Sequence, residues 1–182
     1  GVTMHDNVVV RYSPGGAICT HHGLDECSYN RSVAAYKDLL EWTRISPRVW
    51  VWYYAHGGDK MHPLPHFSSL SHNFKLMRAA GVQGIFVQTD FGSERIEGGG
   101  LLELQSYLLA KLMWDPDYDV QAGIEEFCRA CYGAAAPQMI AFVKMANNAA
   151  TYTGSPRQHY TENEVQQFPG FHCPGGAMVA IK

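Results

Sequence analysis

VWVWYY, residues 49–54, is the stretch that decides the fold. Every one of its positions is apolar or aromatic, which is typical of a parallel strand that is buried on both faces. Two similar runs flank it, NVVVRYS at residues 7–13 and GIFVQTD at residues 84–90. Amphipathic segments separate the runs, so the order is β-α-β-α-β-α. The sequence therefore predicts an α/β fold with parallel strands.

The segments between the runs have the apolar spacing of helices that pack on a sheet. Residues 31–44 place apolar side chains on one face, and Pro47 stops the helix ahead of the next strand. Ser69 or Ser71 can begin the second helix, and Gly81 ends it. The connections after each run are long and rich in turn formers, and loops of that length usually bind something.

From residue 101 onward the chain is predicted to be helical. A leucine stripe runs up to the Asp115–Pro116 turn, and Asp119 is the expected N-cap of the next helix, which ends at Tyr132–Gly133. A further helix is expected to begin near Ala136–Pro137. Cys128 and Cys131 lie on an apolar pattern and are expected in the core, with a redox pair as the alternative.

Composition excludes several classes of protein. The 182 residues are 46% hydrophobic and 17% charged, which is typical of a globular chain. The formal net charge is −3, and Lys and Arg are scattered, so we expect no nucleic-acid partner. No apolar run approaches the roughly 20 residues that span a bilayer, so we expect no membrane span.

Three strands cannot close a barrel, which needs eight strands in about 200 residues or more. We therefore expect either the last three β/α units of a partial (β/α)8, TIM-like barrel or a small open sheet, followed by a helical extension. The expected divisions are residues 1–115 for the barrel part, 116–150 for the helical extension and 151–182 for a linker or the start of a next element. The remaining barrel strands would belong to a longer parent chain.

The carboxyl ends of parallel strands hold the working residues of α/β proteins. Arg11, Trp52, Tyr54, Gln88 and Asp90 lie at or near those ends. Trp52 and Tyr54 share one face of their strand and can stack on a ligand ring, although a core role is equally open. Asp90 is the best placed carboxylate for catalysis, with a structural role in capping the following loop as the alternative.

Nine histidines raise the question of a metal site. The loop from Cys19 to Cys27 also carries His21, His22 and Asp25, which are enough donors for zinc. No pair has a familiar ligand spacing such as C-x-x-C or H-E-x-x-H, so we expect neither a metal nor another cofactor. A metal-dependent hydrolase at this loop stays the third alternative.

Three phrases carry a family resemblance: RSVAAYKDLLEWTRISPRVWVWYY, GVQGIFVQTD and LLELQSYLLAKLMWDPDYDVQAGIEEFCRACYGAAAPQM. Together they resemble the carboxyl-terminal part of domain-of-unknown-function family 4838, over about residues 11–145. That family is similar to glycoside hydrolase barrels such as the alpha-glucuronidases, often in bacterial proteins that process polysaccharides. The resemblance implies an extracellular or periplasmic location. Members tend to have an acidic residue where this chain has Tyr53–Tyr54.

The leading hypothesis is a glycoside-hydrolase-like domain that hydrolyses carbohydrate by carboxylate acid/base chemistry. Asp90 would be the catalytic carboxylate, and Trp52 and Tyr54 would stack on a sugar. Arg11, His21, His56 and Gln88 would bind hydroxyls or a uronate carboxylate. The expected partner is an oligo- or polysaccharide, and activity is expected of the parent protein and not of this fragment alone. A non-catalytic carbohydrate-binding domain is the alternative.

Overall fold

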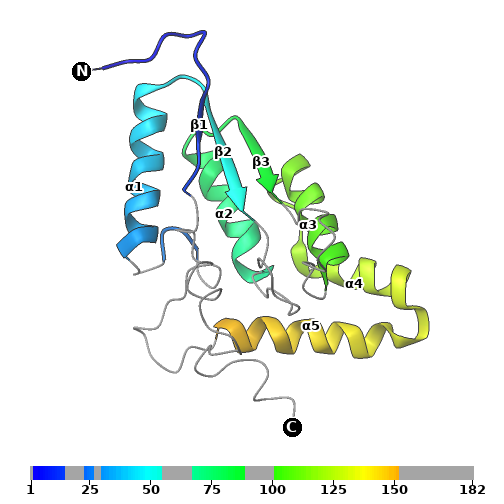
Figure 1. Ribbon diagram of the computed structural model, residues 1–182. Helices are drawn as coiled ribbons and strands as arrows, with labels where there is room; N and C mark the ends of the chain where they lie inside the picture. Colours follow the sequence, from blue (N-terminus) through cyan, green and yellow to red (C-terminus); the bar gives the residue numbers. More distant parts are fainter. Residues whose placement is uncertain (1, 15–22, 27–29, 55–66, 89–100, 152–182) are drawn as a thin grey trace, which may run out of the picture.

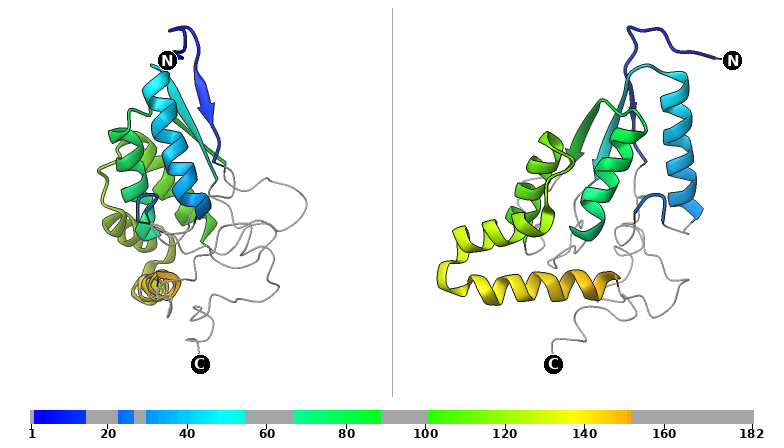
Figure 2. Two further views of the ribbon diagram at one scale, coloured as in Figure 1. Left: turned by 90° about the vertical axis from the view of Figure 1, so that its left-hand side faces the viewer. Right: turned by 180° about the vertical axis from the view of Figure 1, so that it is seen from behind.

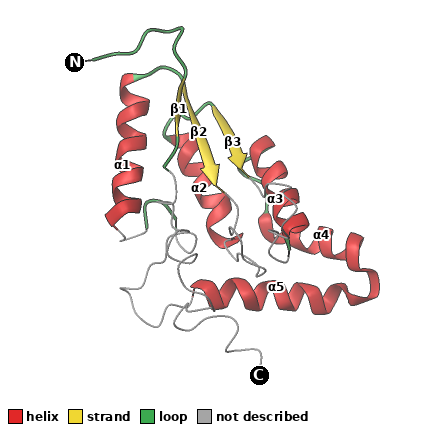
Figure 3. Ribbon diagram, viewed as in Figure 1, coloured by secondary structure: helices red, strands yellow, loops and turns green. Residues whose placement is uncertain are grey.

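The computed structural model describes residues 2–14, 23–26, 30–54, 67–88 and 101–151, and in them helices follow strands as the sequence predicts (Figures 1 and 3). The elements are β1 (Val10–Tyr12), α1 (Asn30–Ile45), β2 (Val49–Tyr54), α2 (Phe67–Ala79), β3 (Gly84–Gln88), α3 (Leu102–Trp114), α4 (Val120–Tyr132), a 3-10 turn (Gly133–Ala135) and α5 (Ala136–Thr151). None of the helices described is long and apolar enough to cross a membrane.

The strands form an open, parallel sheet in the order β1-β2-β3. Arg11 pairs with Trp50, Trp52 with Phe86 and Tyr54 with Gln88. The predicted α/β class with parallel strands is therefore confirmed. Among the described residues the sheet is open, and it has the three strands that the sequence predicts.

Helices α1 and α2 both cover the same face of the sheet (Figure 2, left). Val49, Val51 and Tyr53 point to that face and are at most 2% exposed, whereas Trp50 and Phe86 on the other face are 46% and 45% exposed. The expectation that β2 is buried on both faces is therefore wrong within the described residues. Right-handed crossovers that add strands in one direction place every helix on one side. None of the described helices covers the other side, which we call the uncovered face, although Gln88 on it is only 8% exposed.

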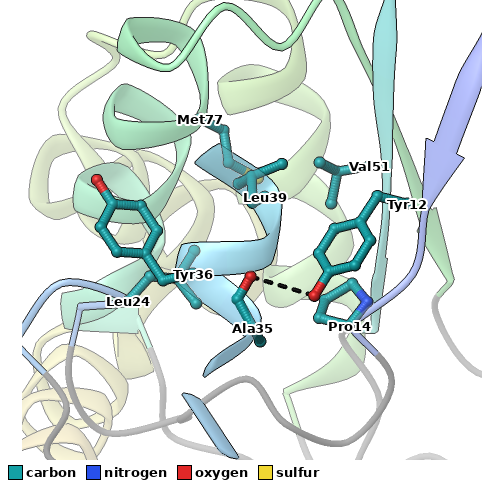
Figure 4. Close-up of a pocket in the computed structure, with 8 residues that line it drawn as sticks. All are labelled: Tyr12, Pro14, Leu24, Ala35, Tyr36, Leu39, Val51 and Met77. Carbon is teal, nitrogen blue, oxygen red and sulfur yellow. Dashed lines mark hydrogen bonds between the residues drawn. The ribbon is translucent and has the colours of Figure 1, made fainter. Parts of the chain in front are cut away.

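The core lies between the sheet and α1 and α2. Leu39, Leu70, Phe74 and Met77 project from the helices and are nearly or fully inaccessible. Burial of such side chains contributes about 1.5–3 kcal/mol each, so this layer fixes the helices to the sheet. A small apolar cavity remains beside β1, lined by Tyr12, Pro14, Leu24, Ala35, Tyr36, Leu39, Val51 and Met77 (Figure 4).

The hydroxyl of Tyr12 enters this apolar layer from β1. It donates a hydrogen bond to the carbonyl oxygen of Ala35 at 3.1 Å (Figure 4). Burial, together with the negative charge of Asp38, raises the pKa of Tyr12 to about 12. The strand is thus tied to α1 by a hydrogen bond that exists only while Tyr12 is neutral.

The helical extension follows the predicted signals closely. The Asp119 carboxylate accepts hydrogen bonds from the backbone N–H of Gln121 and Ala122, at 2.9 and 3.1 Å, so the predicted N-cap is confirmed. Gly133 at the end of α4 has a φ of +52°, a conformation that suits glycine. Helices α4 and α5 then run back along each other as a hairpin (Figure 1).

Two predicted boundaries differ from the structure. β1 is shorter than residues 7–13 because a turn precedes it, in which the Val8 N–H bonds the His5 carbonyl oxygen at 2.9 Å. α2 begins at Phe67, before Ser69. Its Ser68 N–H donates to Asn147 Oδ1 of α5 at 3.1 Å, a tertiary cap that local sequence does not reveal.

The two cysteines of α4 have different environments. Cys128 is fully buried, as predicted, and burial raises the pKa of its thiol. Cys131 is exposed, so its predicted place in the core is wrong. Cys131 lies in the last turn of α4, next to the end of the helix at Tyr132, so the apolar pattern did not reveal that its side chain faces solvent.

Gly84 of β3 leaves room for the indole of Trp50 on the uncovered face of the sheet. A Cβ atom at Gly84 would lie 2.7 Å from Cε2 of the Trp50 indole, which is closer than such atoms approach. The indole therefore packs directly on the backbone of the neighbouring strand.

Candidate functional site

Three predicted site residues, one from each strand, meet on the uncovered face of the sheet. Arg11 comes from β1, Trp52 from β2 and Gln88 from the carboxyl end of β3. Side chains on a strand alternate between faces, and the parallel register brings these three to the face opposite α1 and α2. Trp52 is at the centre of this cluster, which we call the Trp52 cluster and which also includes Trp50 and Phe86.

The ring of Trp52 is held from several directions. Its Nε1–H donates a hydrogen bond to Oε1 of Gln88 at 2.8 Å. The guanidinium carbon of Arg11 lies over the ring, 4.9 Å from its centroid. Phe86 packs against it edge to face, with centroids 5.1 Å apart and ring planes at 83°.

Each of these interactions is modest, yet together they fix one orientation of the indole. A hydrogen bond, an aromatic pair and an exposed cation–π contact each contribute on the order of 1 kcal/mol. The guanidinium of Arg11 occupies one side of the Trp52 ring. A sugar that stacks on that side of Trp52 would have to displace Arg11, so the ring surfaces most available to a ligand are those of Trp50 and Phe86, which are 46% and 45% exposed.

The electrostatics of this face depend on Arg11. It is the only charged residue within the three strands. Within the part of the chain that the structure describes, Arg11 forms no ion pair with a carboxylate, and its guanidinium contacts the ring of Trp52. The uncovered face is thus aromatic, with one positive charge.

The other predicted site residues cannot be placed. His21, His56 and Asp90 lie outside the described residues, and so does the side chain of Tyr54, whose backbone pairs with Gln88. Their predicted roles stay predictions.

Of the donors predicted as an alternative metal site, only Asp25 lies in the described part. Its carboxylate contacts Nε2 of His72 at 2.6 Å, and the described residues contain no group of three or more metal-ligating side chains. The same segment is tied to α2 by Asn73, whose Oδ1 accepts the Leu24 N–H at 2.9 Å.

Sequence reasoning missed two members of the Trp52 cluster, Trp50 and Phe86. The signal for them was present, because residues two apart on a strand share a face. Trp50 shares its face with Trp52, and Phe86 shares its face with Gln88. The exposure of both rings follows from the one-sided helix packing, which the alternation of strands and helices alone did not specify.

Comparison with known protein families places the chain. The model of DUF4838, a domain of unknown function, matches residues 1–144. The chain belongs to the DUF4838 family. The resemblance seen in the sequence is thereby confirmed for the family, whose description assigns no activity. No curated protein and no solved structure matches the chain.

Proposed function

We propose that this DUF4838 domain binds carbohydrate on the uncovered face of its sheet, as part of a glycoside hydrolase. The observation that carries the proposal is the Trp52 cluster, in which exposed aromatic rings lie beside a fixed indole, a guanidinium and an amide. Sugar rings present apolar C–H faces and hydroxyl edges. Rigid aromatic side chains and planar polar groups suit both.

The topology supports a place for the domain within a larger (β/α)8 barrel. Strands are added in sequence order and their crossover helices cover one face. In a barrel the helices form the outer ring, the lower layers of the opposite face pack in the interior, and the active site lies at the carboxyl ends of the strands. In this proposal carbohydrate therefore reaches the Trp52 cluster from the carboxyl ends of the strands, at Trp52 and Gln88. Gln88 ends β3 at that side of the sheet, and in this proposal the remaining strands come from the parent protein.

The chemistry proposed is hydrolysis by two carboxyl groups. One, protonated, donates its proton to the glycosidic oxygen as the bond to the anomeric carbon breaks. Water supplies the oxygen that joins that carbon, and its proton passes to the second carboxylate. Asp90, two residues beyond β3, is proposed as one member of the pair, and the other strands of the parent would supply its partner.

The first prediction concerns Asp90. We expect the full-length protein to hydrolyse at least one member of a panel of aryl glycosides and uronides. Asp90→Asn should lower the turnover rate by about 100-fold or more, the usual effect of removing a general acid or base. The affinity for the same ligand should stay within a few-fold of the wild-type value. Asp25→Asn is the matched control, because the Asp25 carboxylate contacts His72 of α2, on the helix side of the sheet, and its loss should leave turnover unchanged.

A non-catalytic carbohydrate-binding domain is the second candidate. It is favoured by the absence of any carboxylate from the three strands that form the described part of the face. This candidate predicts glycan binding that survives Asp90→Asn, with no turnover by the parent protein on any substrate of the panel. Loss of turnover in Asp90→Asn would exclude it, and failure of any glycan to bind would overturn both candidates.

A further inference from the structure

We infer that the Trp52 cluster recognises an anionic sugar, with Arg11 as the group that selects it and Trp52 as the residue that positions Arg11. The inference rests on the proposed function and names its class of ligand. The sequence-based hypothesis had Trp52 stack on the sugar. Here Trp52 instead contacts the guanidinium of Arg11, and Arg11 binds the sugar.

Within the described part of the chain, Arg11 lies over the ring of Trp52 and its side chain makes no hydrogen bond, so its N–H donors are available there. A guanidinium carries five N–H donors in its plane. When the plane stacks on an aromatic ring, those donors point outward from its edge. The guanidinium carbon lies 4.9 Å from the ring centroid of Trp52, and the described part of the chain provides no carboxylate to Arg11.

Trp52 is itself prevented from turning away. Gln88 accepts its N–H at 2.8 Å, and Phe86 supports the ring edge to face at 5.1 Å. The position of the guanidinium is therefore set by contacts from two other strands. A preorganised cation of this kind loses little conformational entropy when an anion binds.

The surroundings of Arg11 suit an acidic ring better than a free anion. Trp50 and Phe86 offer exposed aromatic surface on the same face of the sheet. An acidic sugar could place its ring on this aromatic surface and its charged group against Arg11. Carboxylates and sulfate esters both accept paired hydrogen bonds from a guanidinium, so the shared chemistry is a sugar that carries an anionic substituent.

The test compares matched pairs of oligosaccharides for binding to the full-length protein by calorimetry. One pair is a hexuronate oligosaccharide and its carboxyl-reduced, neutral form, and the other is a sulfated oligosaccharide and its desulfated form. We expect the acidic member of at least one pair to bind about tenfold or more tightly, which corresponds to about 1.4 kcal/mol. The pair that shows the preference identifies carboxylate or sulfate as the group recognised, and added salt should reduce the preference.

Variants then assign the preference to residues. Arg11→Gln should remove it while keeping affinity for the neutral form, and Arg11→Lys should keep only part of it, because lysine lacks the planar fork. Trp52→Leu removes the ring that positions Arg11 and should therefore reduce the preference for the acidic member. If Trp52 had only a structural role, this preference would not change. Arg48→Gln is the control: it removes the same charge from an exposed arginine just before β2, and should change nothing.

Two outcomes would overturn the inference. If the acidic and neutral members bind alike and Arg11→Gln has no effect, Arg11 does not select the ligand, although the proposed carbohydrate site stands. If no oligosaccharide binds, the proposed function fails as well. Circular dichroism of each variant shows whether it has folded. If Arg11→Gln does not fold, Arg11→Lys replaces it in the comparison.

Discussion

Tyr12 shows how a single hydroxyl can connect a short edge strand to a helix. Its ring lines the cavity between the sheet and α1, and its O–H bonds Ala35 at 3.1 Å (Figure 4). The pKa of Tyr12 is raised to about 12 by burial and by Asp38. In an unfolded chain tyrosine titrates near a pKa of about 10. The unfolded state therefore loses this proton first as the pH rises, and Tyr12 stabilises the fold fully below pH 10 and progressively less towards pH 12.

We predict that Tyr12→Phe makes the protein less stable at neutral pH and less sensitive to alkali. Loss of the hydrogen bond should lower the free energy of unfolding by about 1 kcal/mol at pH 8. Between about pH 10 and 12 the wild type should lose up to about 3 kcal/mol that the variant does not lose. Urea unfolding at pH 8 and pH 11 measures both effects.

Tyr36→Phe is the matched control for this prediction. Tyr36 lines the same cavity, and in the described part of the chain its hydroxyl makes no hydrogen bond. If Tyr12→Phe and the wild type lose equal free energies of unfolding between pH 8 and pH 11, Tyr12 does not titrate as inferred.

At the scale of elements, the best predictions were those whose cause is local. VWVWYY and the strand GIFVQ were found because strand residues are continuous in sequence, and α4 was found because Asp119 and Gly133 mark its two ends. The features that the sequence did not reveal depend on contacts between elements that are distant in sequence. Asn147 of α5 completes the first turn of α2, and the exposure of Trp50 depends on which face the helices cover. That Arg11, Trp52 and Gln88 lie close together could be predicted from the parallel strands, but their contacts could not, and their role in binding stays a prediction.

Helix α4 offers a direct measure of such a local signal. Asp119→Ala should lower the free energy of unfolding by about 1 kcal/mol, within a range of about 0.5–2, because the N–H groups of Gln121 and Ala122 lose their acceptor. Asp119→Ser should recover most of the loss, since a serine hydroxyl also caps. Equal losses in the two variants, measured by urea unfolding, would show that the carboxylate acts in some way other than as a cap.

At the scale of the whole molecule, one hydrophobic cluster extends from Leu24 to Val143. It includes Val51 of the sheet and Ile124 of α4, so it crosses the predicted division between residues 1–115 and 116–150. Arg78 of α2 also bonds Asp117 at 2.9 Å, which lowers the pKa of that carboxyl. These contacts favour cooperative unfolding of the two parts.

Tryptophan fluorescence can test that cooperativity, because all four tryptophans precede residue 115. We use Trp114→Phe as the background, since Trp114 lies next to the division and is 92% exposed. In that background Ile124→Ala should lower the fluorescence-detected stability by about 2–5 kcal/mol, the usual cost of such a core truncation. An unchanged fluorescence midpoint, with an earlier loss of helical circular dichroism, would mean that the helical extension unfolds as a separate domain.

The contact between Trp50 and the backbone of Gly84 has a consequence for how this face can change during evolution. Any side chain at position 84 would meet the indole, 2.7 Å from its Cε2 atom, so the two positions are not free to vary independently. Within the DUF4838 family we expect substitutions at these positions to be correlated, with larger residues at 84 accompanied by smaller ones at 50. The double variant Trp50→Leu/Gly84→Ala should accordingly be more stable than the sum of the two single changes predicts. One pair of neighbouring positions would then mark which lineages have kept the aromatic face and which have given it up.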